Sequence, residues 1–183
     1  MRPLPFPTPP ARAESRVRKA GIRGGERAFT LVELSVVVFI ISVLAALGVP
    51  ALKKVSLESR SVAVVNDLRV FSGAFQAYTH EHGDWPAGNG TPGGIPEGME
   101  GYLGATAWSR VTPIGGLYTW DPNSTQQGER YRAVIVLATA NGHAVTADRA
   151  QLTDLDRRID DGDLDAGKFQ LGFRNYPVFV LEH

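Results

Sequence analysis

The clearest pattern along the chain is one long apolar run near its N-terminal end. No charged side chain occurs from Leu34 to Val49, where Ser35 and Ser42 are the only polar residues. With its flanks, the run covers residues 29–52, enough for a helix to cross a hydrocarbon layer that needs ~20 residues. Its one charge is Glu33, and a carboxylate at the centre of a bilayer costs ~2.5–3.5 kcal/mol. We therefore predict a functional role for this carboxylate.

After Pro50 the run gives way to an amphipathic pattern, in which side chains three, four and seven positions apart form a stripe on one helix face. The stripe comprises Leu57, Ser61, Val64, Leu68, Phe71, Phe75 and Tyr78. The pattern predicts one helix from about Thr30 to His82, ending at Gly83. Its first part, 29–52, would cross the membrane, and 53–82 would continue it as an amphipathic helix. Proline lacks an amide hydrogen, so we expect the helix to bend or loosen at Pro50.

The remaining residues, 83–183, combine a loop-rich segment with strand signals. Glycine and proline recur over 83–116, which predicts a long connection. Alternating and β-branched patterns then predict strands at 117–120, 131–137, 169–173 and 177–181, with 131–137 central. A helix is expected over 147–159 with Thr146 as its N-cap. The three tryptophans would be core or loop anchors, with a ligand groove as the alternative. The expected fold class is α+β: a long N-terminal helix packed on a small antiparallel sheet.

The net charge of zero hides an asymmetry that predicts orientation. Residues 1–28 carry a net charge of +5 and the rest of the chain −5. A basic flank before a spanning helix stays cytoplasmic, so the C-terminal domain should lie outside the inner membrane. We interpret 1–28, which is rich in proline, arginine and glycine, as a disordered leader. The chain has no cysteine, so no disulfide can stabilise the exported domain.

Two other interpretations of the apolar run stay open. It could be an ordinary secretory signal cleaved at the small residues Ala46-Leu47-Gly48, or a plain membrane anchor. In an ordinary secretory signal, the charge of Glu33 would have no function at the edge of the signal's apolar segment.

The hexapeptide from Ala28 to Glu33, with a basic segment before it and an apolar helix after it, resembles the processing site of type IV prepilins and type II secretion pseudopilins. The resemblance implies that a prepilin peptidase cuts between Ala28 and Phe29 and methylates the new amino group of Phe29. Glu33 matches the family's characteristic glutamate, and Pro50 its late helix-breaking proline. Ala28 departs from the glycine usual before the cut.

The same resemblance implies a single-pass inner-membrane protein with a cytoplasmic N-terminus and a periplasmic C-terminal domain. It would assemble into a periplasm-spanning filament with residues 29–52 as the filament core. Its expected partners are the prepilin peptidase, copies of itself and other pseudopilins, the inner-membrane secretion platform and membrane lipid. The favoured function is a subunit of a type II secretion pseudopilus, similar to the major, G-type subunit. The alternative is a type IV pilin or minor pilin acting in adhesion, motility or DNA uptake. Nucleic acid is not an expected partner, because the exported part is acidic.

An acidic loop near the C-terminus is the one candidate metal site. Asp161, Asp163 and Asp165 have the alternate spacing with which a calcium-binding EF-hand begins, but Ala166 and Gly172 replace its glycine and glutamate. Calcium is therefore a possible cofactor, and a solvated Asp/Gly turn is the alternative. No catalytic triad can be nominated from the sequence and cysteine is absent, so we do not expect an enzyme.

Overall fold

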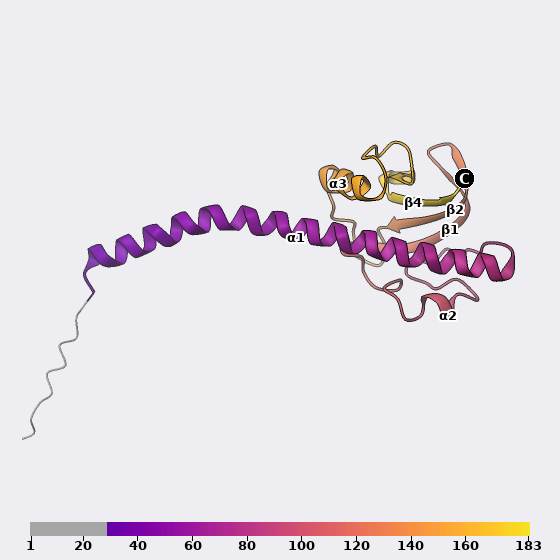
Figure 1. Cartoon of the computed structure of the whole chain (residues 1–183), viewed down its shortest axis with the longest axis horizontal. Coiled ribbons are helices and arrows are strands. Elements are labelled where there is room, and N and C mark those ends of the chain that lie inside the picture. The colour runs from indigo at the N-terminus through magenta and orange to yellow at the C-terminus, as the bar shows by residue number, and fades with distance from the viewer. Residues whose placement is uncertain (1–28) are drawn as a thin grey trace, which may run out of the picture. The chain divides into compact units, whose positions relative to one another are not determined.

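The computed structural model describes residues 29–183, and the expected leader, 1–28, lies outside the described residues. The chain divides into two units, one ending at Val43 and the other beginning at Leu44, and helix α1 contributes to both. In chain order (Figure 1), the elements are α1 (Leu31–His82), α2 (Glu100–Leu103), β1 (Leu117–Gln126), β2 (Glu129–Ala138), α3 (Arg149–Ile159), β3 (Phe169–Leu171), the 3-10 turn η1 (Phe173–Asn175) and β4 (Pro177–Glu182).

Within the second unit, α1 buries the predicted stripe against the rest of the domain. The buried side chains of the helix are Ser61, Val64, Val65, Leu68, Phe71 and Phe75. Leu57 was placed in the stripe but is 43% exposed, because the buried face begins one turn later, at Ser61. The helix ends at His82, and Gly83, with φ of 84°, donates its N–H to the Thr79 carbonyl at 2.8 Å.

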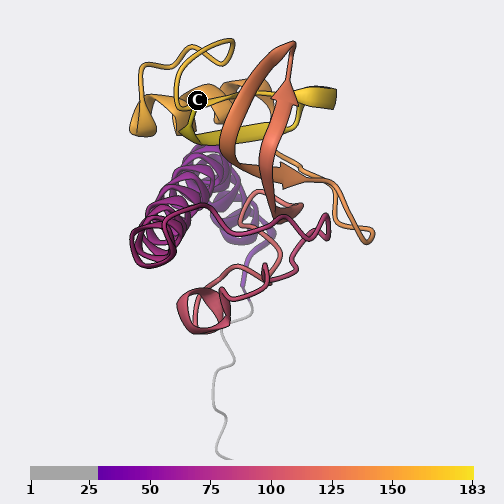
Figure 2. The same cartoon turned by 90° about the vertical axis from the view of Figure 1, so that its right-hand side faces the viewer.

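The four strands form one antiparallel sheet in the order β1-β2-β4-β3. Figure 2 views α1 nearly end-on, with the sheet on one side of the helix and α2 on another. Strand β2 is central, and its residues from Ala133 to Leu137 are buried in succession, as its β-branched sequence predicted. The predicted α+β fold, a long helix packed on a small antiparallel sheet, is confirmed.

Aromatic side chains join the helix to the sheet. The ring of Phe71 meets those of Trp108 and Tyr118 edge-on, with centroids 5.0 and 4.8 Å away, and Phe75 stacks on Trp120 at 4.0 Å. Edge-to-face and offset pairs of this kind add ~0.5–1.5 kcal/mol beyond the area that they bury. The core of the second unit is therefore centred on this cluster.

Two tryptophans also hold the long connection between α1 and β1. The indole N–H of Trp108 donates to the Gly94 carbonyl, and that of Trp120 donates to the Pro86 carbonyl, both at 2.8 Å. Both side chains are buried, so the prediction of core and loop anchors is confirmed for them. Carbonyl groups of the connection thus accept the hydrogen bonds of the two indole N–H groups that lie in the core.

Strand β1 is longer than predicted. The predicted strand ends at residue 120, before Pro122, yet pairing with β2 continues to Gln126. Proline cannot donate a ladder hydrogen bond and is tolerated on edge strands, and β1 is an edge strand. The predicted end of the strand at residue 120 was wrong, because the local sequence does not show that β1 lies at the edge of the sheet.

The predicted N-cap of the second main helix was wrong. Helix α3 begins at Arg149, and its N-cap is Asp148, whose Oδ1 accepts from the Gln151 N–H at 2.8 Å. Thr146 instead donates both its N–H and its hydroxyl to the Ile114 carbonyl, at 2.8 and 3.0 Å. Aspartate and threonine are both good caps, so a tertiary contact decided between them.

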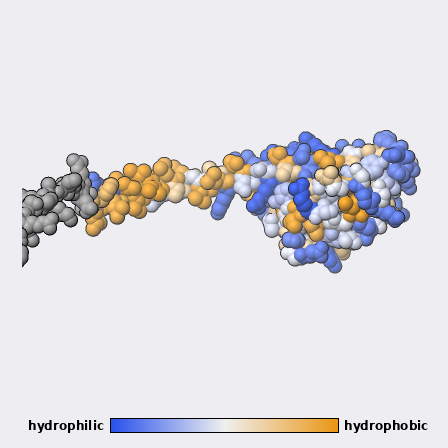
Figure 3. All heavy atoms as spheres, turned by 90° about the horizontal axis from the view of Figure 1, so that it is seen from below, coloured by the Kyte–Doolittle hydropathy of each residue, from blue (hydrophilic) through white to orange (hydrophobic). Residues whose placement is uncertain are grey.

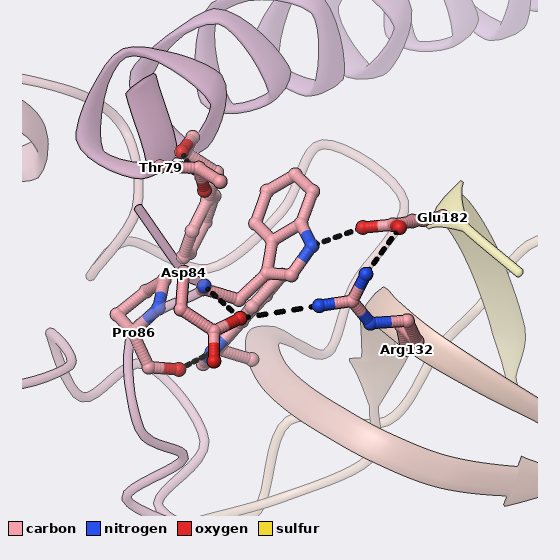
Figure 4. A network of polar contacts seen from close by, with 8 residues as sticks. Thr79, Asp84, Pro86, Arg132 and Glu182 are labelled. Atoms are coloured by element: carbon pink, nitrogen blue, oxygen red, sulfur yellow. Dashed lines mark hydrogen bonds and ion pairs between the residues drawn. The ribbon is translucent and has the colours of Figure 1, made fainter. Parts of the chain in front are cut away.

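A polar network ties the exit of α1 to the sheet (Figure 4). Arg132 of β2 lies between two carboxylates, 2.6 Å from Glu182 and 3.2 Å from Asp84. The indole N–H of Trp85 donates to the other oxygen of Glu182. Exposed ion pairs contribute ~0.2–1 kcal/mol each, so the network fixes geometry more than it adds stability.

One carboxylate of α3 is buried without a partner. Asp156 is 0% exposed, and neither of its oxygens makes a hydrogen bond of normal geometry within residues 29–183. Burial raises the pKa of Asp156 to about 6, and the charges of Asp161, Asp160 and Asp163 act in the same direction, while the Gly162 amide opposes them. A carboxyl whose pKa is higher in the folded protein than in the unfolded chain lowers the free energy of unfolding as the pH rises from the unfolded-state pKa to the folded-state pKa.

We expect Asp156→Asn to stabilise the domain relative to the natural chain at pH 8, and by progressively less as the pH falls to 4. In the unfolded chain this carboxyl ionises near its ordinary value of 3.8, whereas in the fold it ionises near 6, so the penalty appears between these values. The measurement is chemical unfolding of a calcium-free fragment, residues 53–183, which keeps every buried residue of α1.

The matched control is Asp154→Asn on the same helix, where the carboxylate pairs with Arg158 at 3.0 Å. That variant should gain nothing at pH 8. A pH-independent difference between Asp156→Asn and the natural chain would contradict the assignment of the penalty to this carboxylate.

Candidate processing and assembly site

The candidate site begins at the first described residue, Phe29, whose side chain is 82% exposed. Ala28, on the other side of the predicted cut, lies outside the described residues. The chain enters α1 directly after Thr30, and the Leu34 N–H donates to the Thr30 carbonyl at 3.2 Å. The predicted cleavage point thus lies just before the helix begins.

Glu33 folds back on the start of its own helix. One carboxylate oxygen, Oε2, accepts from the N–H and from the hydroxyl of Thr30, both at 2.9 Å. The Thr30 hydroxyl in turn accepts from the Glu33 N–H at 3.2 Å. This reciprocal arrangement is a capping box, which satisfies backbone N–H groups that a helix N-terminus leaves without partners.

The sequence analysis missed this role of Thr30. The spacing of threonine and glutamate, with two residues between them and an apolar run after them, is the capping-box signature. It could have been recognised from the sequence alone. Both carboxylate contacts use Oε2, so Oε1 has no hydrogen-bond partner among the described residues.

The surface of α1 that follows is apolar all round. Its exposed residues include Val36, Phe39, Ile40, Leu44 and Leu47, and Figure 3 shows apolar side chains covering the visible face of the helix in the first unit. The hydroxyls of Ser35 and Ser42 donate to the carbonyls of Val32 and Val38, at 2.8 and 2.7 Å. Helix α1 is long and apolar enough to cross a membrane.

Pro50 lies inside α1, and the helix continues through it. Proline cannot donate the hydrogen bond that the Ala46 carbonyl would otherwise accept. The predicted bend or loosening at this position stays a prediction.

The acidic loop has a different geometry from the one expected of three calcium ligands. The Asp161 carboxylate accepts from the Asp163 N–H at 2.9 Å, and the Asp163 carboxylate accepts from the Asp165 N–H at 3.1 Å. Asp165 lies 3.7 Å from Arg149. No group of three carboxylate or histidine side chains is close enough to hold a metal in the described part of the chain. The loop therefore caps its own turns, and the calcium prediction stays a prediction.

Comparison with known proteins bears on both the N-terminal helix and the domain. Residues 23–49 match the Prokaryotic N-terminal methylation motif. Among solved structures, the chain is similar to the major Type IV pilin PilA1 from Clostridium difficile, with 17% sequence identity and a TM-score of 0.50. That match covers 69% of this chain and 97% of the pilin. No curated protein matches the chain.

The motif covers the capping box and most of the apolar helix, and the structural likeness extends to the sheet. At 17% identity the likeness to the pilin shows the fold alone, and the motif is a separate finding about residues 23–49. The chain therefore carries a prepilin-type methylation motif at residues 23–49 and has the fold of a type IV pilin, and the two findings together support the type IV prepilin-like family.

Proposed function

We propose that the chain is a structural subunit of a type II secretion pseudopilus, processed by the prepilin peptidase between Ala28 and Phe29 and N-methylated at Phe29. The observation that carries the proposal is the Glu33 carboxylate, held at the start of an exposed apolar helix by Thr30. The absence of cysteine and the small domain favour a subunit similar to the major, G-type one. Family membership implies a structural rather than an enzymatic role.

A type IV pilin is the second candidate. It is favoured by the similarity to a major type IV pilin, whose chain is covered almost completely. The two candidates share the same processing and assembly chemistry. They differ in the machine that the filament serves, and therefore in the partners of its outer surface.

Assembly would use the oxygen of Glu33 that Thr30 leaves free. In a helical filament, the new amino group at Phe29 of a neighbouring subunit can approach Oε1 while Thr30 holds Oε2 in place. Pairing of the two charges in a dry core offsets the desolvation that each alone would cost. The pair would fix the axial register of the subunits more than it adds net stability.

The apolar part of α1 would anchor the subunit in the inner membrane before assembly and form the filament core afterwards, with the N-terminus cytoplasmic and the domain periplasmic. Its partners would be the prepilin peptidase, the secretion platform, other pseudopilins and membrane lipid. Pro50 would let the helix adjust between these environments.

Calcium binding at the acidic loop is a further part of the proposal. The support is Asp156, a buried carboxylate without a hydrogen-bond partner whose pKa is raised in part by the charges of Asp161 and Asp163. A cation held by Asp156, Asp161, Asp163 or Asp165 would remove this penalty, because hard cations bind carboxylate oxygens. The loop would have to open its capped turns to do so.

The first prediction from the proposed function concerns processing. Membrane-extracted protein should begin at Phe29 and carry one methyl group on its amino nitrogen, as intact-mass measurement and N-terminal sequencing would reveal. A mature protein beginning at Val49 would instead identify an ordinary secretory signal.

The second prediction separates the charge of Glu33 from its capping role. Glutamine also suits this position of a capping box, so Glu33→Gln keeps the shape and the cap but removes the charge. We expect normal processing and loss of filaments, because a buried amino group without its partner costs ~3–5 kcal/mol at every added subunit. The measurement is filament or secretion output from a strain with this single copy, at matched subunit abundance.

Thr30→Val is the matched control, since it removes the cap and keeps the charge. Its filaments should persist at reduced stability, because the loss of a cap costs ~0.5–2 kcal/mol. Normal filaments from Glu33→Gln subunits would refute the pairing role of the carboxylate.

The third prediction tests the metal. Chelation should lower the melting temperature of the 53–183 fragment, and excess calcium should restore it, because a ligand that binds only the native state stabilises it. In Asp156→Asn the calcium-dependent shift should shrink or vanish. An identical melting curve with and without calcium would favour a solvated turn.

A further inference from the structure

The turn between β3 and β4 presents an aromatic side chain to solvent. Phe173 is 63% exposed, and the guanidinium carbon of Arg174 lies 5.3 Å from the centre of its ring. Arg174 and Asn175 both have positive φ, 57° and 58°, a conformation that side chains other than glycine rarely adopt. Backbone of this kind persists only where its surroundings hold it. We refer to residues 173–175 as the Phe173 turn.

The tip of the β1–β2 hairpin holds the turn in place. The Phe173 N–H donates to Oε1 of Gln126 at 2.8 Å, and the side chain of Gln127 donates to the Leu171 carbonyl. A side chain at Gly172 would collide with Gln126 and Val178, so the backbone there lies directly against the hairpin. The backbone that carries the exposed ring is therefore held in place before any partner arrives, which lowers the entropy cost of binding.

A groove between α1 and the start of α3 has the complementary character. It has a volume of about 320 Å³ and a largely apolar surface that includes Leu57 and Ala150. A cavity of ~150 Å³ suffices for a benzene ring, so the α1–α3 groove can admit a phenylalanine side chain. Leu57, which the sequence analysis assigned to the core, is left exposed in its wall.

Charge at the rim of the groove complements that of the turn. Glu58 and Asp154 already have basic partners, Lys54 at 4.0 Å and Arg158 at 3.0 Å. Asp148 caps α3 and pairs with no lysine or arginine in the described part of the chain. Arg174 likewise pairs with no carboxylate among the described residues.

We propose that the Phe173 turn of one subunit inserts into the α1–α3 groove of a second copy, with Phe173 against Leu57 and Ala150 and Arg174 near Asp148. The two surfaces differ, so the contact is heterologous, and repeated heterologous contacts build open helical filaments. The proposal rests on the proposed function and adds a contact between the soluble domains to the one at Glu33. Interfaces typically depend on a few aromatic and arginine side chains of this kind.

Cysteine cross-linking tests the contact directly, because the natural chain has no cysteine. Two full-length copies with different tags, one carrying Phe173→Cys and the other Ala150→Cys, are co-expressed at low level with the natural chain in the filament-producing strain. The natural subunits keep the filaments growing, and cysteine is a small apolar side chain that can still enter the groove. Mild oxidation of sheared filaments should yield a disulfide-linked dimer that contains both tags. Each variant expressed alone should yield none, because the contact joins unlike surfaces.

Val111→Cys paired with Ala150→Cys is the matched control, since Val111 is also an exposed apolar residue. It should yield no dimer. Filaments that contain both copies but show no Phe173–Ala150 dimer would overturn the domain contact and leave the proposed function standing. A natural chain that forms no filament in any strain would overturn both.

Charge pairing is tested by Arg174→Gln and Asp148→Asn. Asparagine is also a good N-cap, so the second variant keeps α3 capped while it removes the charge. Each should reduce filament yield, and the double variant should be no worse than either single one, because both remove the same pair. Phe173→Ser should cause a larger loss, on the order of tenfold. Additive effects of the two charge variants, or a natural yield from Phe173→Ser, would contradict the proposal.

Discussion

The soluble domain depends on the burial of one face of α1 by aromatic side chains. Phe71 and Phe75 are completely buried, and the rings that cover them come from the 83–116 connection and from β1. Each such side chain contributes ~1.5–3 kcal/mol through burial, and the chain has no cysteine with which to supplement the core. The sheet and the connection would have no common surface to pack against without this face of the helix.

The same face accommodates a polar contact that joins helix and sheet. The Tyr118 hydroxyl donates to Oδ2 of Asp67 at 3.0 Å, and burial raises the pKa of Asp67. A hydrogen bond to a charged group is worth ~1.5–3 kcal/mol. It also requires a defined rotation of the helix about its axis, because the tyrosine and the aspartate must meet. Apolar packing alone would specify that rotation less strictly.

Periodic features could be predicted from the sequence, and features that depend on tertiary context could not. The stripe of α1, the central strand and the methylation motif are repeated or local patterns, and the prediction succeeded for them. Three features depend on segments distant in the sequence. Strand β1 accepts Pro122 because it lies at the edge of the sheet, and Thr146 does not cap α3 because it binds the Ile114 carbonyl. Leu57 stays exposed because the domain does not cover this turn of α1. The burial of Asp156 could not be predicted either, because nothing in the neighbouring sequence shows that its carboxylate points into the core. At the N-terminus, the threonine of the capping box was within reach of a local pattern and was overlooked.

The capping box also bears on how a subunit could be held in the membrane before assembly and after release from the proposed filament. A carboxylate that already accepts hydrogen bonds from Thr30 enters lipid with part of its polar demand met by its own chain. Joining the proposed filament would add a partner to a group that already accepts hydrogen bonds, and leaving it would not place a bare carboxylate in the bilayer. In the proposed filament, the contribution of the Glu33 carboxylate to the difference in free energy between a membrane-anchored and an assembled subunit would be correspondingly small. A small difference of this kind favours reversible exchange between a membrane reservoir and the filament, so the machinery that drives growth could also disassemble what it has built.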